Sequence, residues 1–344
     1  MTSQDGKKVL ITGANGFIGR HIVCEALARG YGVWAGVRAV SSLAHLPQDR
    51  IHRMNLEYGD PQALTGQLSQ FVHEHGAWDY VVHNAGLTKT THPRDFFHVN
   101  AVCTHHLLEA LARANCRPRK FLLMSSLGAC GAGNQDTLRP IGLDDPQQPD
   151  TVYGKSKLMA ENHVRAQQDF PYVILRPTGV YGPGDTDYLM EINSIRAGFD
   201  FAVGRQPQHL TFIYVKDLAS VVFDTLENAA ITNRSFFVAD GDVHTDAEFA
   251  RTIQDILQKK HVFRLRIPLW LAWWACICFE GVGRLTGRAM TLNSDKYKIL
   301  RQRNWICDTG PLHRETGFTP AYNLRRGLEE TIRTIETPQS NKQH

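Results

Sequence analysis

Apolar and polar positions in the first half of the chain follow two alternating periods. Short runs rich in Val, Ile, Leu and Phe precede longer segments in which apolar residues recur three and four positions apart. The runs predict strands and the segments predict helices, so the alternation predicts right-handed βαβ units and an α/β fold with a parallel, doubly wound sheet. The expected strands lie within 7–13, 32–38, 51–56, 78–86 and 120–126, and the expected helices within 17–29, 61–75 and 96–114, with a short helical stretch after residue 38 and a helix around Tyr153.

The second half of the chain has a looser pattern. Gly and Pro become frequent after residues 172–185, and residues 210–228 and 234–240 carry apolar runs expected of a return to the sheet. From about residue 241 the spacing is mainly helical. We therefore expect a Rossmann-type nucleotide-binding domain and a smaller, mostly helical C-terminal substrate lobe. The nucleotide-binding domain is expected to cover residues 1–182 and to be completed by about 209–240. The substrate lobe is expected to cover residues 183–208 and 241–335, and residues 336–344 to form a frayed tail.

One apolar stretch stands out from this pattern. Residues 267–279 contain no charged side chain and hold three of the six tryptophans. As a helix the stretch would be about 20 Å long, shorter than the roughly 30 Å hydrocarbon core of a bilayer, so we do not expect it to span a membrane. One face of that helix would carry Trp270, Trp273, Trp274, Ile277 and Cys278.

Three uses of this stretch are open from the sequence. A helix that is apolar all round is usually part of a core. Tryptophan between cationic residues is also typical of a membrane interface. The third use is the wall of a substrate entrance, which could dip into an anionic membrane surface through residues 264–288. The flanking cations are Arg264, Arg266, Arg284 and Arg288.

The composition is that of a globular protein in a reducing compartment. Of 344 residues, 42% are hydrophobic and 21% are charged, and the chain does not open on a secretory hydrophobic segment. The seven cysteines are scattered without a C-x-x-C pair, so we expect reduced cytoplasmic thiols and no metal site. The net charge is +4, yet residues 259–303 carry ten Lys and Arg against two acids, a local +8. Elsewhere no basic stripe is interleaved with aromatic residues, so no nucleic-acid partner is expected.

Three glycines open the first predicted βα unit. Gly13, Gly16 and Gly19 lie between the strand and the helix, where glycine allows a tight turn and a close approach of main-chain N–H groups to a pyrophosphate. The turn predicts a dinucleotide site. Its other lining residues would be Asn15, Phe17 and Ile18.

The end of the second predicted strand bears on the choice between NAD and NADP. An NAD site usually carries Asp or Glu there for the ribose hydroxyls, whereas here Val37 is followed by Arg38. A carboxylate would repel a 2′-phosphate, and a guanidinium can bind one through paired hydrogen bonds. The sequence favours NADP(H). NAD(H) is the alternative if Arg38 stacks on adenine or points to solvent.

Tyr153 and Lys157 form a candidate acid–base pair. Their spacing of four places them on one face of a helix. A tyrosine with an ordinary pKa of about 10 is a poor catalyst at neutral pH, and a neighbouring ammonium favours the phenolate. Ser126 ends the preceding strand, where its hydroxyl could hold a carbonyl or alcohol oxygen, with Ser125 as the alternative.

In their order along the chain, these motifs resemble those of the extended short-chain dehydrogenases/reductases. The likeness covers roughly residues 7–335 and rests on Thr12-Gly13-x-x-Gly16-x-x-Gly19, His83-Asn84-Ala85-Gly86, Asn100, Ser126, Tyr153-x-x-x-Lys157 and Arg176-Pro177. The resemblance implies that Tyr153 transfers the proton, that Lys157 tunes it and holds the nicotinamide ribose, and that Ser126 orients the reacting oxygen. It also implies that Asn100 stabilises a helix outside the chemistry. The implied further cofactor contacts are Asn55, Leu56, Ala85, Gly86 and Pro177.

Three departures from the family pattern narrow the expected substrate. The 4,6-dehydratases follow the serine or threonine with Asp-Glu, whereas Leu127-Gly128 stand here. Sugar-nucleotide enzymes generally carry Arg-Asp before the F-I-Y-V-x-D stretch to bind a diphosphate. Leu210-Thr211 take those places here, although Arg205 could compensate. Epimerases retain NAD, whereas Val37-Arg38 suits an exchangeable NADPH.

The second lobe resembles that of the 3β-hydroxysteroid dehydrogenases and lipid ketone reductases. The resemblance implies an NADP-dependent oxidoreductase that interconverts a ketone and a secondary alcohol on a bulky sterol-, sphingoid- or lipid-like substrate. The alternatives are a nucleotide-sugar 4-epimerase or reductase with bound NAD, and a non-catalytic NADPH-binding scaffold. The resemblance also suggests a homodimer through helices at 98–114 and 153–168, and a cytoplasmic protein that touches the inner face of a membrane.

Overall fold

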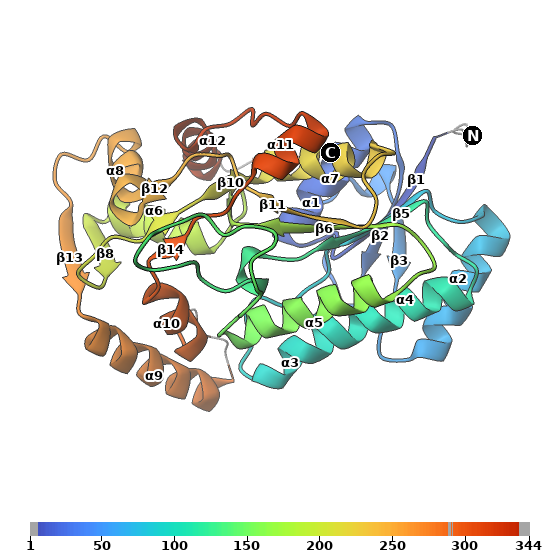
Figure 1. The fold of residues 1–344 in the computed structure, drawn as a ribbon, viewed down its shortest axis with the longest axis horizontal. Coiled ribbons are helices and arrows are strands. Elements are labelled where there is room, and N and C mark those ends of the chain that lie inside the picture. The colour runs from blue at the N-terminus through green and yellow to red at the C-terminus, as the bar shows by residue number, and fades with distance from the viewer. Residues whose placement is uncertain (1–5, 288–289, 291, 337–344) are drawn as a thin grey trace.

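A seven-stranded parallel sheet forms the centre of the computed structural model, which describes residues 6–287, 290 and 292–336 (Figure 1). The strand order is β11-β6-β5-β4-β1-β2-β3. Because the order runs outward in both directions from β1, the sheet is doubly wound, as the alternating pattern predicts. The strands are β1 (Lys8–Thr12), β2 (Gly32–Val37), β3 (His52–Asn55), β4 (Tyr80–His83), β5 (Lys120–Met124), β6 (Tyr172–Pro177) and β11 (Arg234–Val238).

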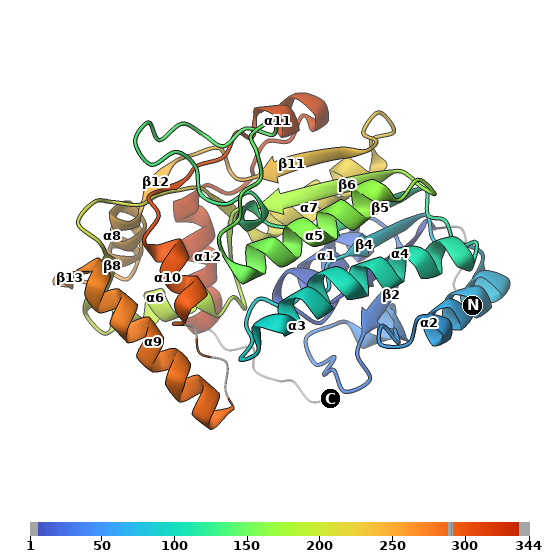
Figure 2. The same cartoon turned by 60° about the horizontal axis from the view of Figure 1, so that its bottom comes forward.

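Helices cover both faces of this sheet (Figure 2). One hydrophobic core lies between the sheet and the helices α1 (Phe17–Ala28) and α7 (Val215–Glu227). A second core lies under α2 (Pro61–His75), α4 (Cys103–Arg113) and α5 (Val152–Ala166). The central strands β4 and β5 are buried at every position, as a parallel sheet covered on both faces requires.

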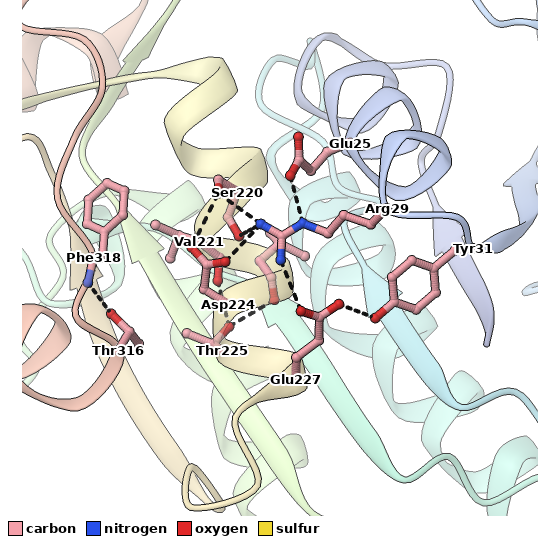
Figure 3. Close-up of polar contacts among 11 residues, drawn as sticks. Glu25, Arg29, Tyr31, Ser220, Val221, Asp224, Thr225, Glu227, Thr316 and Phe318 are labelled. Atoms are coloured by element: carbon pink, nitrogen blue, oxygen red, sulfur yellow. Dashed lines mark hydrogen bonds and ion pairs between the residues drawn. The ribbon is translucent and has the colours of Figure 1, made fainter. Parts of the chain in front are cut away.

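Arg29 ties α1 to α7 at the end of the first core (Figure 3). Its guanidinium lies 2.8 Å from Asp224 and 3.1 Å from Glu227 of α7, and 2.7 Å from Glu25 one turn back on α1. The Tyr31 hydroxyl donates to the same Glu227 carboxylate at 2.5 Å. This cluster fixes the helix that follows the glycine turn against the helix that precedes β11.

Two expectations for the first lobe are wrong in detail. Residues 38–47 form turns, and only a short 3-10 helix, Gln48–Arg50, precedes β3, because this segment offers too few regularly spaced apolar positions to cover a helix face. Within 210–228, Leu210 ends the short strand β9 (His209–Leu210), and β10 (Phe212–Tyr214) pairs with β7 (Gly179–Tyr181). Both strands lie outside the central sheet. The rest is α7, whose buried residues recur at helical spacing.

The second lobe is mainly helical and has its own hydrophobic core. That core joins α6 (Asp187–Arg196), α8 (Asp246–Ile256) and α12 (Leu324–Glu336). Around it lie short strands and further helices: β8 (Phe199–Val203), β9 (His209–Leu210), β12 (His244–Thr245), β13 (Phe263–Ile267), α9 (Leu269–Thr286), α10 (Ser294–Leu300), β14 (Asn304–Trp305) and α11 (Gly310–Thr316).

The tryptophan-rich stretch is an exposed helix and not part of the core. The helix α9 begins after Pro268, which ends strand β13, and it stops at Gly287, whose φ of +66° is the left-handed conformation typical of a helix end. Trp270 is 65% exposed and Trp274 is 54% exposed. The interpretation as core is therefore wrong. Within the described ranges, no helix is both long enough and apolar enough to cross a bilayer.

Candidate active site

The glycine turn between β1 and α1 is closed so tightly that side chains would not fit. Gly13 has a φ of +64°, and a Cβ placed there would lie 2.8 Å from the Cα of Ala85. A Cβ on Gly19 would lie 2.1 Å from the carbonyl oxygen of Gly13. The turn thus brings the start of α1 against the segment that follows β4. This is the cradle that a pyrophosphate needs at a helix N-terminus.

Thr12 and His83 join the ends of β1 and β4 beneath this cradle. The Thr12 hydroxyl accepts a hydrogen bond from the N–H of Ala85 at 3.0 Å and lies 2.9 Å from Nδ1 of His83. Burial, with a smaller contribution from the Lys157 charge, lowers the pKa of His83 to about 3, so its imidazole is neutral. No role for His83 was predicted from the sequence. Its place in the His-Asn-Ala-Gly motif was the one signal in the sequence that could have pointed to it.

Arg38 follows the end of β2, which pairs in parallel with β1. It is exposed directly after β2, beside the buried Val37, and its side chain forms no hydrogen bond or ion pair within the described part of the chain. Asn55 is the register partner of Val37 in β3, and the following Leu56 is buried. Arg53 donates to the carbonyl of Ala39 at 2.6 Å, which holds the loop after Arg38 in place.

The helix α5 carries Tyr153 and Lys157 toward the end of β5. Lys157 is buried, and its ammonium donates to the carbonyl of Met124 at 2.8 Å. Burial lowers the pKa of Lys157 to about 8, while the charge of Glu161 acts in the opposite direction. A Cβ on Gly86 would lie 3.1 Å from the Lys157 ammonium, so Gly86 leaves open the space beside it.

The two adjacent serines point to different partners. Ser125 is buried and donates to the carboxylate of Glu161 at 2.6 Å, so its hydroxyl is occupied. Ser126 is half-buried and accepts from the N–H of Gly128 at 3.1 Å. Burial raises the pKa of Tyr153, and a hydrogen bond with Ser126 lowers it. Contrary to the expectation of a lowered pKa, burial outweighs the other contributions in this structure. Ser126 is the serine that faces Tyr153.

Asn100 connects the loop after β4 with α5. It lies in a π-helical segment, His98–Val102, that joins α3 (Pro93–Phe97) to α4. Its amide donates to the carbonyl of Leu87 at 3.1 Å and to the hydroxyl of Ser156 at 2.9 Å, and it accepts from the N–H of Leu87 at 2.7 Å. These contacts hold a helix and a loop beside the site, in agreement with the stabilising role expected of Asn100.

Glu161 anchors α5 to β6 behind the two serines. Its fully buried carboxylate lies 2.9 Å from the guanidinium of Arg176, at the end of β6 just before Pro177. Burial acts to raise the pKa of Glu161, but the hydrogen bonds and charge of Arg176 hold it below the usual value. Pro177 is buried at the same end of the sheet. The ends of β1, β4, β5 and β6 thus converge on one edge.

Comparison with known proteins places this arrangement in a family. The profile of the NAD dependent epimerase/dehydratase family matches residues 9–239. The chain belongs to this family. Its fold is that of the extended short-chain dehydrogenases/reductases, and membership of the family supports an enzyme with a nicotinamide dinucleotide cofactor.

Relatives within the family act on different substrates. The chain is 25% identical to a UDP-glucose 4-epimerase of Vibrio cholerae, over 96% of this chain and 95% of the relative. It is 27% identical to a ceramide reductase of Caulobacter vibrioides, over 94% and 93%. Among solved structures, a UDP-glucose 4-epimerase of Thermotoga maritima has a TM-score of 0.75 at 19% identity, covering 96% and 98%, which shows the fold.

Positions 210 and 211 are those at which sugar-nucleotide members of the family were expected to carry Arg-Asp. In this chain both residues make other contacts. Thr211 is buried, and its hydroxyl donates to the carbonyl of Trp305 at 3.1 Å. Leu210 is half-buried against the core of the second lobe. Arg205 is exposed. No cationic side chain therefore stands at positions 210 and 211.

A hollow that is open to solvent lies beside two neighbours of Tyr153, Phe96 and Val152, on the side of the second lobe. Phe96 of α3 forms part of its wall and contacts the Tyr153 ring edge-to-face, with ring centres 5.9 Å apart. Val152 belongs to the same wall, and Met290 and Gly283 line the opposite side. This hollow could not be predicted from the sequence because its lining at 280–295 lies more than 100 residues along the chain from the lining at 90–96 and 152.

Proposed function

We propose that the protein is an NADP-dependent oxidoreductase that interconverts a ketone and a secondary alcohol on a bulky, apolar substrate. The observation that carries the proposal is the wall of the hollow beside two neighbours of Tyr153. Phe96, Val152 and Met290 offer apolar surface there, and the cation of its lining, Arg284, is paired with Glu280 in the same lining. Away from this wall, position 211 is a buried threonine bonded to Trp305. An apolar molecule gains from such a wall, whereas a diphosphate needs cationic partners.

The residues around the glycine turn fit a nicotinamide dinucleotide. Gly13, Gly16 and Gly19 would hold the pyrophosphate, and Arg38 would bind the 2′-phosphate that distinguishes NADP from NAD. The space beside Gly86 would admit the nicotinamide ribose next to Lys157. When bound, the cofactor supplies or accepts a hydride.

The other steps fall to side chains of the chain itself. Ser126 would hold the reacting oxygen of the substrate by a hydrogen bond. The Tyr153 hydroxyl would give a proton to that oxygen in reduction, or take one in oxidation. Lys157, while charged, would favour the phenolate and ease the transfer. Burial raises the Tyr153 pKa and therefore keeps the hydroxyl protonated before substrate arrives, which suits proton donation in the direction of reduction.

Some relatives support an apolar substrate, and another supports a nucleotide sugar. The ceramide reductase of Caulobacter vibrioides and a sterol-4-alpha-carboxylate 3-dehydrogenase of Saccharomyces cerevisiae, 23% identical over 94% of this chain, are named for lipid substrates. The UDP-glucose 4-epimerase of Vibrio cholerae is about as similar. Nucleotide-sugar epimerisation is therefore the second candidate function. The absence of a cation at positions 210 and 211 speaks against it.

A substrate panel separates the two candidates. NADPH oxidation by the purified protein should be measured with sterol and sphingoid ketones, and UDP-glucose epimerisation should be measured beside it with NAD. We expect oxidation with a lipid ketone, no epimerisation, and loss of turnover in Tyr153→Phe with little change in NADPH affinity. A UDP-sugar that is bound and epimerised, with no lipid ketone reduced, would contradict the proposal. So would full turnover in Tyr153→Phe.

A further inference from the structure

The second lobe ends in an exposed apolar surface formed by two elements, which we term the apolar edge. The first element is the two-stranded ribbon of β8 and β13, at the left end of the molecule in Figure 1. Phe199 pairs with Phe263 and Phe201 pairs with Leu265, so all four side chains project from one face of the ribbon. They are 46%, 62%, 54% and 43% exposed, respectively.

The second element of the apolar edge is α9, which follows the ribbon through Pro268. Only Ala272, Cys276 and Gly283 are buried in it, and they fall on the side of the helix that packs toward α10. The remaining circumference is mostly apolar and exposed. It includes Trp270, Trp273, Trp274, Ile277, Phe279 and Leu285.

This distribution favours a lipid surface over a protein partner. A protein that packed against α9 would cover one stripe, whereas apolar side chains here extend over nearly all of the circumference that α10 leaves free. A helix immersed among acyl chains needs no polar face on its submerged sides. Three exposed tryptophans within five residues are typical of the boundary between headgroups and acyl chains.

Cationic side chains border the apolar edge. Lys259 and Lys260 are exposed just before β13 and form no ion pair within the described residues. Arg264 and Arg266 project from the other face of the ribbon, at 3.3 Å from Asp200 and 3.8 Å from Asp246, and are partly neutralised. The lysines therefore supply the uncompensated positive charge that an anionic bilayer attracts.

The hollow described above lies between α9 and the candidate active site. Glu280, Gly283 and Arg284 of α9 line the hollow whose other wall is formed by Phe96 and Val152. The hollow thus has α9 on one side and two neighbours of Tyr153 on the other.

We propose that the apolar edge docks on an anionic bilayer and that the hollow admits an apolar substrate from that bilayer to Tyr153. The docking part of this proposal concerns binding alone and does not depend on catalysis. The part that concerns substrate entry through the hollow rests on the proposed function. At about 1.5 Å per residue, the 18 residues of α9 extend roughly 27 Å, so the helix would lie in the plane of the interface with its tryptophans among the headgroups.

Flotation of the full chain tests the docking. The probes are vesicles of phosphatidylcholine alone and of phosphatidylcholine with phosphatidylserine. We expect the wild type to float with the anionic vesicles and much less with the neutral ones. Trp274→Glu should weaken partitioning by about tenfold or more, because it places a charge where an aromatic ring was buried in lipid. Val243→Glu adds the same charge at an exposed apolar position outside the apolar edge and should float as the wild type does.

A second measurement follows the tryptophan side chains themselves. Brominated acyl chains quench tryptophan that enters the bilayer, so they should quench the wild type but not Trp270→Phe/Trp273→Phe/Trp274→Phe to the same extent. Absence of flotation and of quenching would overturn the docking, and so would a switch from dimer to monomer in Trp274→Glu without lipid binding. Flotation without reduction of any lipid ketone would instead overturn the proposed function and leave docking intact. Equal KM values for a vesicle-borne ketone in the wild type and Trp274→Glu would overturn substrate entry through the hollow.

Discussion

The carboxylate of Asp295 accepts hydrogen bonds from the main-chain N–H groups of Val152 at 2.7 Å and Tyr153 at 3.3 Å. Asp295 belongs to α10 in the second lobe, whereas Val152 and Tyr153 begin α5. The first N–H groups of a helix have no partner within that helix, so Asp295 completes the start of α5 from another lobe. Lys298 holds the second oxygen of Asp295 at 3.0 Å. The position of Tyr153 therefore depends on α10.

We expect Asp295→Ala to lower kcat by about tenfold, because a small displacement of a reacting group is costly and Asp295 fixes the start of the helix that carries it. The affinity for NADPH should change little. Asp295→Asn keeps one acceptor oxygen and should recover most of the rate, which a steady-state assay with NADPH titrations would show. If Ala and Asn have equal effects, or if both act only on NADPH affinity, Asp295 does not position Tyr153.

Ser125 and Ser126 should respond differently to the same substitution. Ser126→Ala removes a hydrogen bond to the reacting oxygen and should reduce kcat/KM roughly 10–100-fold without loss of stability. Ser125→Ala leaves the buried Glu161 without one donor and should lower the free energy of unfolding by about 1–3 kcal/mol while sparing the chemistry. Urea unfolding and kinetics on both variants give the comparison. The reverse pattern would assign the chemistry to Ser125.

The rate should depend on the charge of Lys157. Burial lowers the pKa of Lys157 to about 8, so its ammonium is present below that pH and is lost as pH rises through it. Because the ammonium favours the phenolate, kcat/KM should fall as pH rises above about 8. The residual rate of Lys157→Met should lack this fall. An alkaline limb of the same shape in the variant would mean that another group titrates.

Arg38 should decide between the two cofactors. Arg38→Ala is expected to weaken the affinity for NADPH roughly 10–100-fold, because charge-assisted hydrogen bonds to a phosphate are lost. The affinity for NADH should stay nearly unchanged. Isothermal titration with both nucleotides measures this. Arg50→Ala is a matched control, since Arg50 is exposed in the same inter-strand segment but precedes β3 and lies at the opposite edge of the sheet. Equal losses for NADPH and NADH would assign Arg38 to adenine instead.

The sequence predicted most of the first lobe because its signals are local. Strand and helix periods, the glycine turn, and the spacing of Tyr153 and Lys157 each lie within a few residues. The prediction of Ser126 over Ser125 came only from the family resemblance. The physical difference between the two serines depends on Glu161, which is 36 residues from Ser125 and reaches it only in the folded helix. The homodimer through α4 and α5 stays a prediction.

The second lobe was less predictable because its contacts are distant in sequence. The contact of Asp295 with α5 spans 143 residues. An apolar helix also has the same sequence signature whether it is buried by protein or left exposed, so the exposure of α9 could only come from the structure. Its start after Pro268 and its end before Gly287, in contrast, follow from these two residues.

The fate of the cofactor hydride tests the central claim most directly. Purified protein is incubated with NADPH deuterated at C4 of the nicotinamide on the transferred face, a lipid ketone and UDP-glucose, and the products are analysed by mass spectrometry. The account predicts deuterium in a secondary alcohol formed from the ketone, with NADP released and the sugar unchanged. Epimerised sugar with no deuterated alcohol, and the nicotinamide nucleotide still bound, would contradict it.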